Sequence, residues 1–137
     1  MNSSDEVSST AHRVTLGVGC NCGDRHSAMT LAMEWLCTLL TGARCSAIYE
    51  TEPVGGGTRN YLNAVVTGET LLSDTELNTL LKEYEYAHGR DAEARRRGDV
   101  WIDIDLVMSA DNLLRPFDFS QDFFLQGYSE LTLPKLP

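Results

Sequence analysis

The stretch VWIDIDLVM, residues 100 to 108, predicts a buried β-strand that carries two carboxylates. Successive side chains of a strand point to opposite faces of its sheet, so Asp103 and Asp105 share one face while Ile102 and Ile104 occupy the other. The Cα atoms of the two aspartates then lie roughly 6–7 Å apart, because a strand rises ~3.3 Å per residue. Two carboxylates are unusual in a strand that is otherwise apolar, so Asp103 and Asp105 are candidates for a functional site.

The segments before this strand alternate between strand and helix patterns, with β-branched runs for the strands and apolar residues at i, i+3, i+4 for the helices. They are a strand over 13–21, a helix over 23–40, strands over 44–52 and 60–72, and a helix over 73–89. The glycine-rich loop 53–59 predicts a hairpin between the second and third strands, and the charged segment 90–99 predicts a loop.

The ends of both helices carry recognisable signals. Asp24 is a plausible N-cap of the first helix and Gly42 its C′ residue. Ser73 followed by Glu76 forms a capping-box pattern at the second helix, and Gly89 predicts its end.

The resulting order, β-α-β-β-α-β, predicts an α+β fold of the ferredoxin-like type, with an antiparallel sheet and both helices on one face. Residues 1–12 predict a mobile polar tail, and residues 13–137 a single domain. The last segment, from 109 onward, is aromatic and apolar but has no clear period.

The charge balance restricts the partners that the chain can bind. Its net charge of −9 argues against nucleic acid and against anionic membranes, since both need a basic surface. No apolar run is long enough to span a bilayer and the N-terminus has no signal-peptide core, so the cytoplasm is expected. Five of the eleven Lys and Arg residues fall between Lys82 and Arg97, which favours a small anionic ligand.

Two carboxylates side by side on a sheet face repel each other unless a cation lies between them. Mg²⁺ binds carboxylate oxygens and is completed by substrate phosphates, and Arg90 and the run Arg95 to Arg97 suit the binding of phosphate oxygens. The plain alternative is a solvated arginine run beside an exposed aspartate pair without a ligand. An isolated D-x-D pattern does not decide between these readings.

Four short motifs in this order resemble the family of 6-hydroxymethyl-7,8-dihydropterin pyrophosphokinase, an enzyme of folate biosynthesis. Its patterns GxGSNxGDR, Y-x-T-x-P-x-G with Y/F-L-N-A-V, IExxxGR and xxDxDIL each have a counterpart. The counterparts are LGVGCNCGDR (16–25), YETEPVGGGTRNYLNAVV (49–66), EYEYAHGR (83–90) and WIDIDLVM (101–108). The resemblance implies a ferredoxin-like fold and a Mg²⁺-dependent transfer of pyrophosphate from ATP to the hydroxymethyl group of the pterin.

The resemblance also implies roles for individual residues. Asp103 and Asp105 would bind two Mg²⁺ ions between the ATP phosphates, and Arg90 and Arg96 would complete the catalytic set. The expected pterin-binding residues are Thr51, Val54, Tyr61, Asn63 and Phe123. The expected nucleotide-binding residues are Glu85, Arg90, Arg96 and Arg97. The loops 53–59 and 90–99 correspond to lids that close over both substrates.

This chain departs from the family pattern around the same site. Where the family has R-W-G-P-R-x-x-D-x-D, residues 96–105 are RRGDVWIDID, so Val100 stands in place of an arginine and Arg97 in place of a stacking tryptophan. No tryptophan replaces it unless Trp101 does. Gln121 stands near another family arginine, and much of the family's C-terminal segment is absent.

Losing these arginines implies reduced activity unless Arg95 and Arg97 compensate, since arginine contacts to a phosphoryl transition state contribute several kcal/mol. Three hypotheses follow. The chain is an active pyrophosphokinase, a family member that binds a pterin, a nucleotide or a protein without turnover, or a ferredoxin-like interaction domain with no ligand site. The oligomeric state does not follow from the sequence.

Overall fold

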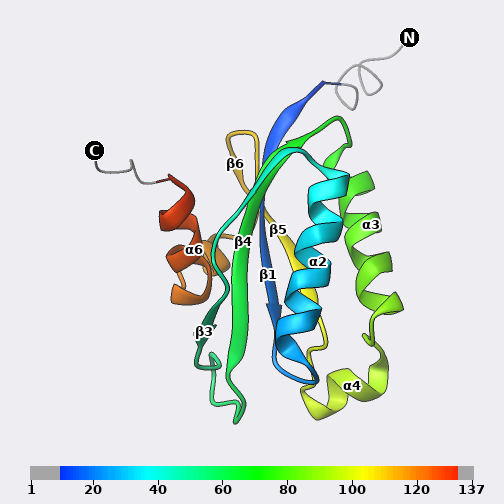
Figure 1. The fold of residues 1–137 in the computed structure, drawn as a ribbon, viewed down its shortest axis with the longest axis vertical. Helices are drawn as coiled ribbons and strands as arrows, with labels where there is room; N and C mark the ends of the chain where they lie inside the picture. Colours follow the sequence, from blue (N-terminus) through cyan, green and yellow to red (C-terminus); the bar gives the residue numbers. More distant parts are fainter. Residues whose placement is uncertain (1–9, 133–137) are drawn as a thin grey trace.

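The computed structural model describes residues 10–132, in which helices pack against a single β-sheet (Figure 1). Its strands are β1 (His12–Cys20), β2 (Thr41–Cys45), β3 (Tyr49–Thr51), β4 (Tyr61–Thr70), β5 (Asp103–Ser109) and β6 (Asn112–Leu113). Its helices are α2 (Arg25–Leu39), α3 (Asp74–Ala87), α4 (Ala92–Arg97), α5 (Pro116–Phe119) and α6 (Asp122–Thr132).

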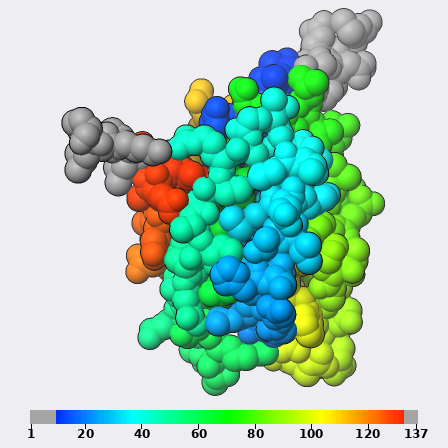
Figure 2. Space-filling model, in the orientation of Figure 1, coloured from blue at the N-terminus to red at the C-terminus, as the bar shows by residue number. Residues whose placement is uncertain are grey.

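The sheet is antiparallel throughout, in the order β2-β4-β1-β5-β6. The short strand β3 pairs with the first residues of β4, on the same edge of β4 that pairs with β2 further along. The helices α2 and α3 cover one face, whereas α6 lies against the other (Figure 1). The α+β, ferredoxin-like prediction is therefore confirmed, as is the hairpin between β3 and β4. In Figure 2, α2 and the chain from β2 to β3 occupy the middle of the visible face, with α3 and α4 to the right and α6 to the left.

The main core lies between the sheet and the two long helices. Ile102, Ile104 and Leu106 are buried there among residues of α2 and α3 such as Leu36 and Leu81, as the alternation in the last strand predicts. A second, smaller core lies on the opposite face. It consists of Val65, Val107, Phe124 and Leu131. The two aspartates of β5 belong to this second face.

The helix starts match the sequence signals. The Asp24 carboxylate accepts the backbone N–H of Ser27, and Ser73 and Glu76 form both hydrogen bonds of a capping box. The prediction that Gly42 follows the first helix as its C′ residue is wrong. The helix is capped by Leu40 in an extended conformation, and Gly42, with φ of 62°, lies inside β2, where the pairing with β4 shifts.

Two other predictions about elements are corrected. The strand expected over 44–52 is interrupted, because the hydroxyl of Ser46 accepts the backbone N–H of Val65 and takes the place of a ladder bond. The segment 90–99 is not all loop, since Asp91 caps the short helix α4 and Gly98, with φ of 75°, ends it.

The polar tail expected over 1–12 lies mostly outside the described residues, and His12 already opens β1. The extent of a single domain over 13–137 stays a prediction. Across residues 10–132, no helix combines the length and the apolar character that a membrane crossing requires.

Candidate active site

A cavity of about 670 Å³ opens on the sheet face opposite α2 and α3. Two glycines on the central strand β1 create its floor, because Gly17 pairs with Asp105, and Gly19 pairs with both Asp103 and Asn63. A Cβ atom on Gly19 would lie 3.1 Å from Oδ1 of Asn63, which is closer than ordinary packing allows. The absence of side chains at Gly17 and Gly19 therefore leaves room for a ligand between β4 and β5.

Most residues that the sequence assigned to substrates line this one cavity. They are Thr51, Val54, Tyr61, Asn63, Arg97, Asp103, Asp105 and Phe123. Asn63 is buried, and its Nδ2 donates to Oγ1 of Thr51 over 2.6 Å, so its amide is fixed in orientation. A fixed amide that offers both a donor and an acceptor suits the edge of a planar heterocycle.

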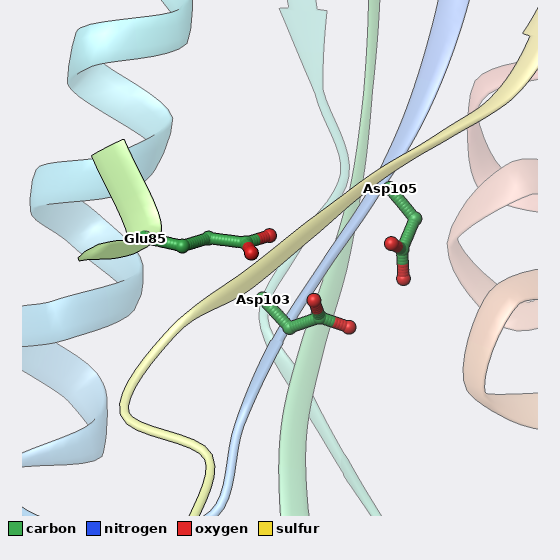
Figure 3. Close-up of side chains that lie close together, drawn as sticks. All are labelled: Glu85, Asp103 and Asp105. Carbon is green, nitrogen blue, oxygen red and sulfur yellow. The ribbon is translucent and has the colours of Figure 1, made fainter. Parts of the chain in front are cut away.

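Three carboxylates converge where β5 passes the end of α3. One oxygen each of Glu85, Asp103 and Asp105 lie within 4.8 Å of one another. Figure 3 shows the aspartates on one side of the β5 ribbon, with Glu85 reaching toward it from the other side. Burial, and next the charge of Asp105, raises the pKa of Asp103 to about 6.

Glu85 is fully buried and supports the free edge of β5. Its carboxylate accepts the backbone N–H of Ile104 over 2.7 Å and pairs with Arg90 and Lys82. Burial raises its pKa, while the Ile104 N–H opposes that rise. Arg90 also lies 3.4 Å from Asp103, and Lys82 lies 3.8 Å from Asp105. Glu85 thus holds two cations beside the aspartate pair from outside the cavity.

The arginines of α4 divide between the cavity and the solvent. Arg97 lines the cavity and donates to Asp99 over 2.9 Å. Arg96 is 72% exposed, pairs with Glu93 and does not line the cavity. Its predicted catalytic and nucleotide-binding roles stay predictions, as do the roles expected of the other site residues.

Trp101 does not take the place of the family tryptophan in the cavity. Its ring lies against Gly23 and Gly89, where an added Cβ atom would come within 2.4 Å and 2.7 Å of it. Both glycines have positive φ, so each is needed for its backbone conformation and for contact with the ring. Trp101 therefore closes the turns that precede α2 and follow α3.

Several residues that line the cavity were not predicted from the sequence as site residues. Asn21 holds the loop before β5 by donating to Gly98 O and accepting from Val100 N–H, over 3.0 Å and 2.7 Å. Arg59 donates to Asp99 over 2.6 Å, which ties loop 53–59 to that same loop. The spacing of Gly17 and Gly19 two residues apart on one strand face would have indicated the cavity floor, but Arg59 gave no local signal.

Arg115 and Asp118 come from the segment in which no period was found. Both line the cavity, and Nε of Arg115 donates to Asp118 over 2.6 Å. The other end of the Arg115 guanidinium lies 3.8 Å from Asp105. The i, i+3 spacing of an arginine and an aspartate around Pro116 was the available signal, because proline favours the first turn of a helix.

The aspartate pair fits a hard divalent cation. Both side chains are partly buried, their oxygens converge, and burial together with the neighbouring Asp105 charge raises the pKa of Asp103. Oxygen-only donors at this spacing match Mg²⁺, which retains waters and takes further oxygens from phosphates. The residues present therefore fit the metal that the sequence implied.

Fold and site together define an α+β domain of ferredoxin-like topology with a carboxylate centre at the edge of a ligand-sized cavity. The family model described as 7,8-dihydro-6-hydroxymethylpterin-pyrophosphokinase matches residues 15–136. The chain belongs to this family.

Individual relatives agree with that assignment. The chain is 34% identical over 127 residues to the 2-amino-4-hydroxy-6-hydroxymethyldihydropteridine pyrophosphokinase of Aquifex aeolicus, a match that covers 86% of the chain and 79% of that protein. It is 36% identical to the protein of the same name from Porphyromonas gingivalis, over 69% and 67% of the two chains. It is 35% identical to the mitochondrial folate synthesis bifunctional protein of Arabidopsis thaliana, in a match that covers 82% of the chain and 22% of that protein.

Proposed function

We propose that this protein transfers the β,γ-pyrophosphoryl group of ATP to the hydroxymethyl group of 6-hydroxymethyl-7,8-dihydropterin, a step of folate biosynthesis. The hydroxymethyl oxygen attacks the β-phosphorus and the bond from that phosphorus to the α,β-bridging oxygen breaks. AMP leaves with the electron pair, and the hydroxyl proton is released. The carrying observation is that the aspartate pair and the residues expected to hold the pterin line one cavity.

Asp103 and Asp105 would hold the Mg²⁺ ions. When bound there, Mg²⁺ would supply the positive charge that offsets the negative charge developing on the transferred phosphoryl group. The chain's own residues then set the geometry. Glu85 fixes the start of β5 through the Ile104 N–H, so the aspartates keep their separation. Arg90, held between Glu85 and Asp103 outside the cavity, adds a positive charge beside the aspartate pair.

The pterin would occupy the part of the cavity between β3, β4 and the start of α6. Asn63 and Thr51 provide hydrogen bonds to the ring edge, and Tyr61 and Phe123 provide flat apolar surfaces. The hydroxyl of Tyr49 donates to the backbone oxygen of Phe123 over 2.7 Å, which fixes the position of the α6 start relative to β3. This placement brings the acceptor against the aspartate pair.

A second candidate is a family member that binds these ligands without turnover. Two observations favour it. Val100 places no charge at the position of a family arginine, and Arg96 points to solvent with Glu93 as its partner.

Measurement of AMP formation with ATP, Mg²⁺ and the hydroxymethyl-dihydropterin decides between the two. We expect AMP to form only when all three are present, and to fall to background in Asp103→Ala and Asp105→Ala. Wild-type protein that forms no more AMP than these variants contradicts the proposed activity. Calorimetric binding of the pterin under those conditions would then support the second candidate.

A further inference from the structure

Arg115 is held at the cavity wall by contacts that fix both ends of the residue. Its backbone N–H and that of Leu114 both donate to Val107 O on β5, over 3.3 Å and 2.8 Å. Its Nε donates to the buried carboxylate of Asp118 over 2.6 Å. The guanidinium is therefore oriented by its own short helix, α5, and by the strand that carries the aspartates.

The rest of the guanidinium remains free to bind an anion. Nη2 of Arg115 is 3.8 Å from Oδ2 of Asp105, which is close enough for attraction but too long for a direct hydrogen bond. The side chain is 47% exposed, and the surface that it presents lines the cavity. An arginine with its Nε satisfied retains two Nη groups in a planar arrangement that matches two oxygens of a phosphate.

The other arginines that line the cavity are placed differently. These are Arg59 and Arg97, and each donates to Asp99, which does not itself line the cavity. Among the cavity arginines, Arg115 is the one paired with a carboxylate of the metal-binding pair. A cation on Asp105 offsets the attraction between that aspartate and Arg115, so the guanidinium then needs another anion.

We propose that Arg115 binds the β,γ-pyrophosphoryl group of the nucleotide, and that Asp118 positions it. Arg115 thus supplies, from the segment between β6 and α5, a positive charge that Val100 does not supply from the segment before β5. The inference rests on the proposed function for the identity of its ligand. It goes further by assigning the phosphate contact to a residue outside the motifs by which the family resemblance was established.

Binding of two nucleotides separates a phosphate contact from a structural role. The test compares Mg²⁺ with α,β-methylene-ATP, which holds the β,γ-pyrophosphoryl group but cannot release it, against AMP, which lacks that group. We expect Arg115→Met to weaken α,β-methylene-ATP binding at least 10-fold and to leave AMP binding unchanged. Arg44→Met on β2, outside the cavity lining, serves as the matched control and should change neither affinity.

Turnover provides the second readout. We expect Arg115→Met to lower kcat/KM by about 100-fold, as loss of one charge-stabilising donor commonly does. Arg115→Lys should restore part of the loss, and added methylguanidinium should rescue Arg115→Ala but not wild type. Asp118→Asn should lower kcat/KM less than Arg115→Met, because the neutral amide oxygen still accepts from Nε.

Equal binding of α,β-methylene-ATP by wild type and Arg115→Met overturns the inference, as does an equal loss of AMP binding in that variant. A wild-type protein without turnover contradicts the proposed activity but not this inference, because the analogue comparison needs no reaction. An inference that fails while wild type turns over leaves the proposed activity intact.

Discussion

The negative charge of Asp103 lowers the free energy of unfolding of the metal-free protein. A carboxyl whose pKa is higher in the folded state than in the unfolded chain favours folding while it is protonated. Its contribution is therefore fully present below the unfolded value of 3.8 and is lost as the pH rises through about 6. Since about a third of the side chain is exposed, solvent screening reduces this penalty to about 1 kcal/mol at pH 7.

We therefore expect Asp103→Asn to raise the free energy of unfolding at pH 7 by about 1 kcal/mol, with a smaller gain at pH 4. The same change should abolish Mg²⁺-dependent nucleotide binding. Urea unfolding in the presence of a chelator measures the first effect, and calorimetry the second. Asp111→Asn, at an exposed position after β5, is the control. A variant less stable than wild type at pH 7 contradicts this explanation.

For Glu85 we expect the opposite effect on stability, because its buried carboxylate is bound by the Ile104 N–H, Arg90 and Lys82. Glu85→Leu leaves the N–H of Ile104 without an acceptor and Arg90 without its main partner, so we expect a loss of about 3 kcal/mol. Glu85→Gln keeps an oxygen for Ile104 and should cost less. Chemical unfolding of both variants checks this order. Equal losses would show that charge, and not the hydrogen bond at the strand edge, is the stabilising factor.

The predictability of individual site residues depended on their surroundings in the sequence. Asp103 and Asp105 were found because an alternating strand makes two carboxylates conspicuous. Asn63 and Tyr61 were found through a family motif. Arg115 and Asp118 were not, because a short helix has too few residues for a hydrophobic period and their contacts with Asp105 and Val107 are tertiary.

The helix α6 docks on β4 through the bare backbone of Gly127. A Cβ atom there would lie 2.7 Å from Val65 Cγ2, 2.8 Å from Ser46 Oγ and 2.9 Å from Tyr49 Oη. Helix propensity alone favours alanine over glycine by about 1 kcal/mol. Overpacking against strand residues commonly costs 1–3 kcal/mol, and here the added atom meets three neighbours.

We therefore expect Gly127→Ala to destabilise the protein by about 2 kcal/mol in urea unfolding, despite its better propensity. The backbone N–H of Gly127 also donates to Tyr49, over 3.1 Å, so a displaced helix should disturb the Phe123 wall of the cavity. Gln126→Ala, exposed on the same helix, should be neutral or slightly stabilising. A stabilised Gly127→Ala variant would mean that α6 moves away from β4 without cost.

At the scale of elements, the sequence predicted those that carry their own signals. The helices α2 and α3 have N-caps and an apolar stripe, so both were found at their N-termini to within two residues. The short helix α4 was missed because its charged sequence resembles a loop. The division of the second strand was missed because it depends on Ser46 bonding to Val65, a contact between distant segments.

At the scale of the molecule, the two sheet faces have separate roles. The face under α2 and α3 holds the larger core, whereas the other face combines a small core under α6 with the cavity. Substitutions in the first core should lower stability and leave the chemistry of the folded fraction unchanged. Asp103 joins the roles, because the unfavourable charge there is what a bound cation would compensate.

The cavity mouth is bridged by two loops that are 39 residues or more apart in the chain. Arg59, at the end of loop 53–59, donates to Asp99 and to Gly98 O, over 2.6 Å and 3.1 Å. On the same loop Gly55 and Gly56 have φ of 83° and 90° and open space around them, so that loop can move once the bridge is broken. Hydrogen bonds from Arg59 and Arg97 lower the pKa of Asp99.

We expect Arg59→Met to increase backbone amide exchange in residues 53–60 and 98–100 and to speed ligand dissociation, while exchange in β1 and β4 stays unchanged. Because the pKa of Asp99 is lowered, the pairing is present above the ordinary aspartate value and is lost only as the pH falls through the lowered one. The factor by which the substitution raises the exchange rate of these amides should thus be the same at pH 5.5 and at pH 8. Arg44→Met again serves as the control. If both proteins exchange these amides at equal rates, the bridge between Arg59 and Asp99 does not restrain the loops, and their order comes from Asn21 and its bonds to Gly98 and Val100 instead.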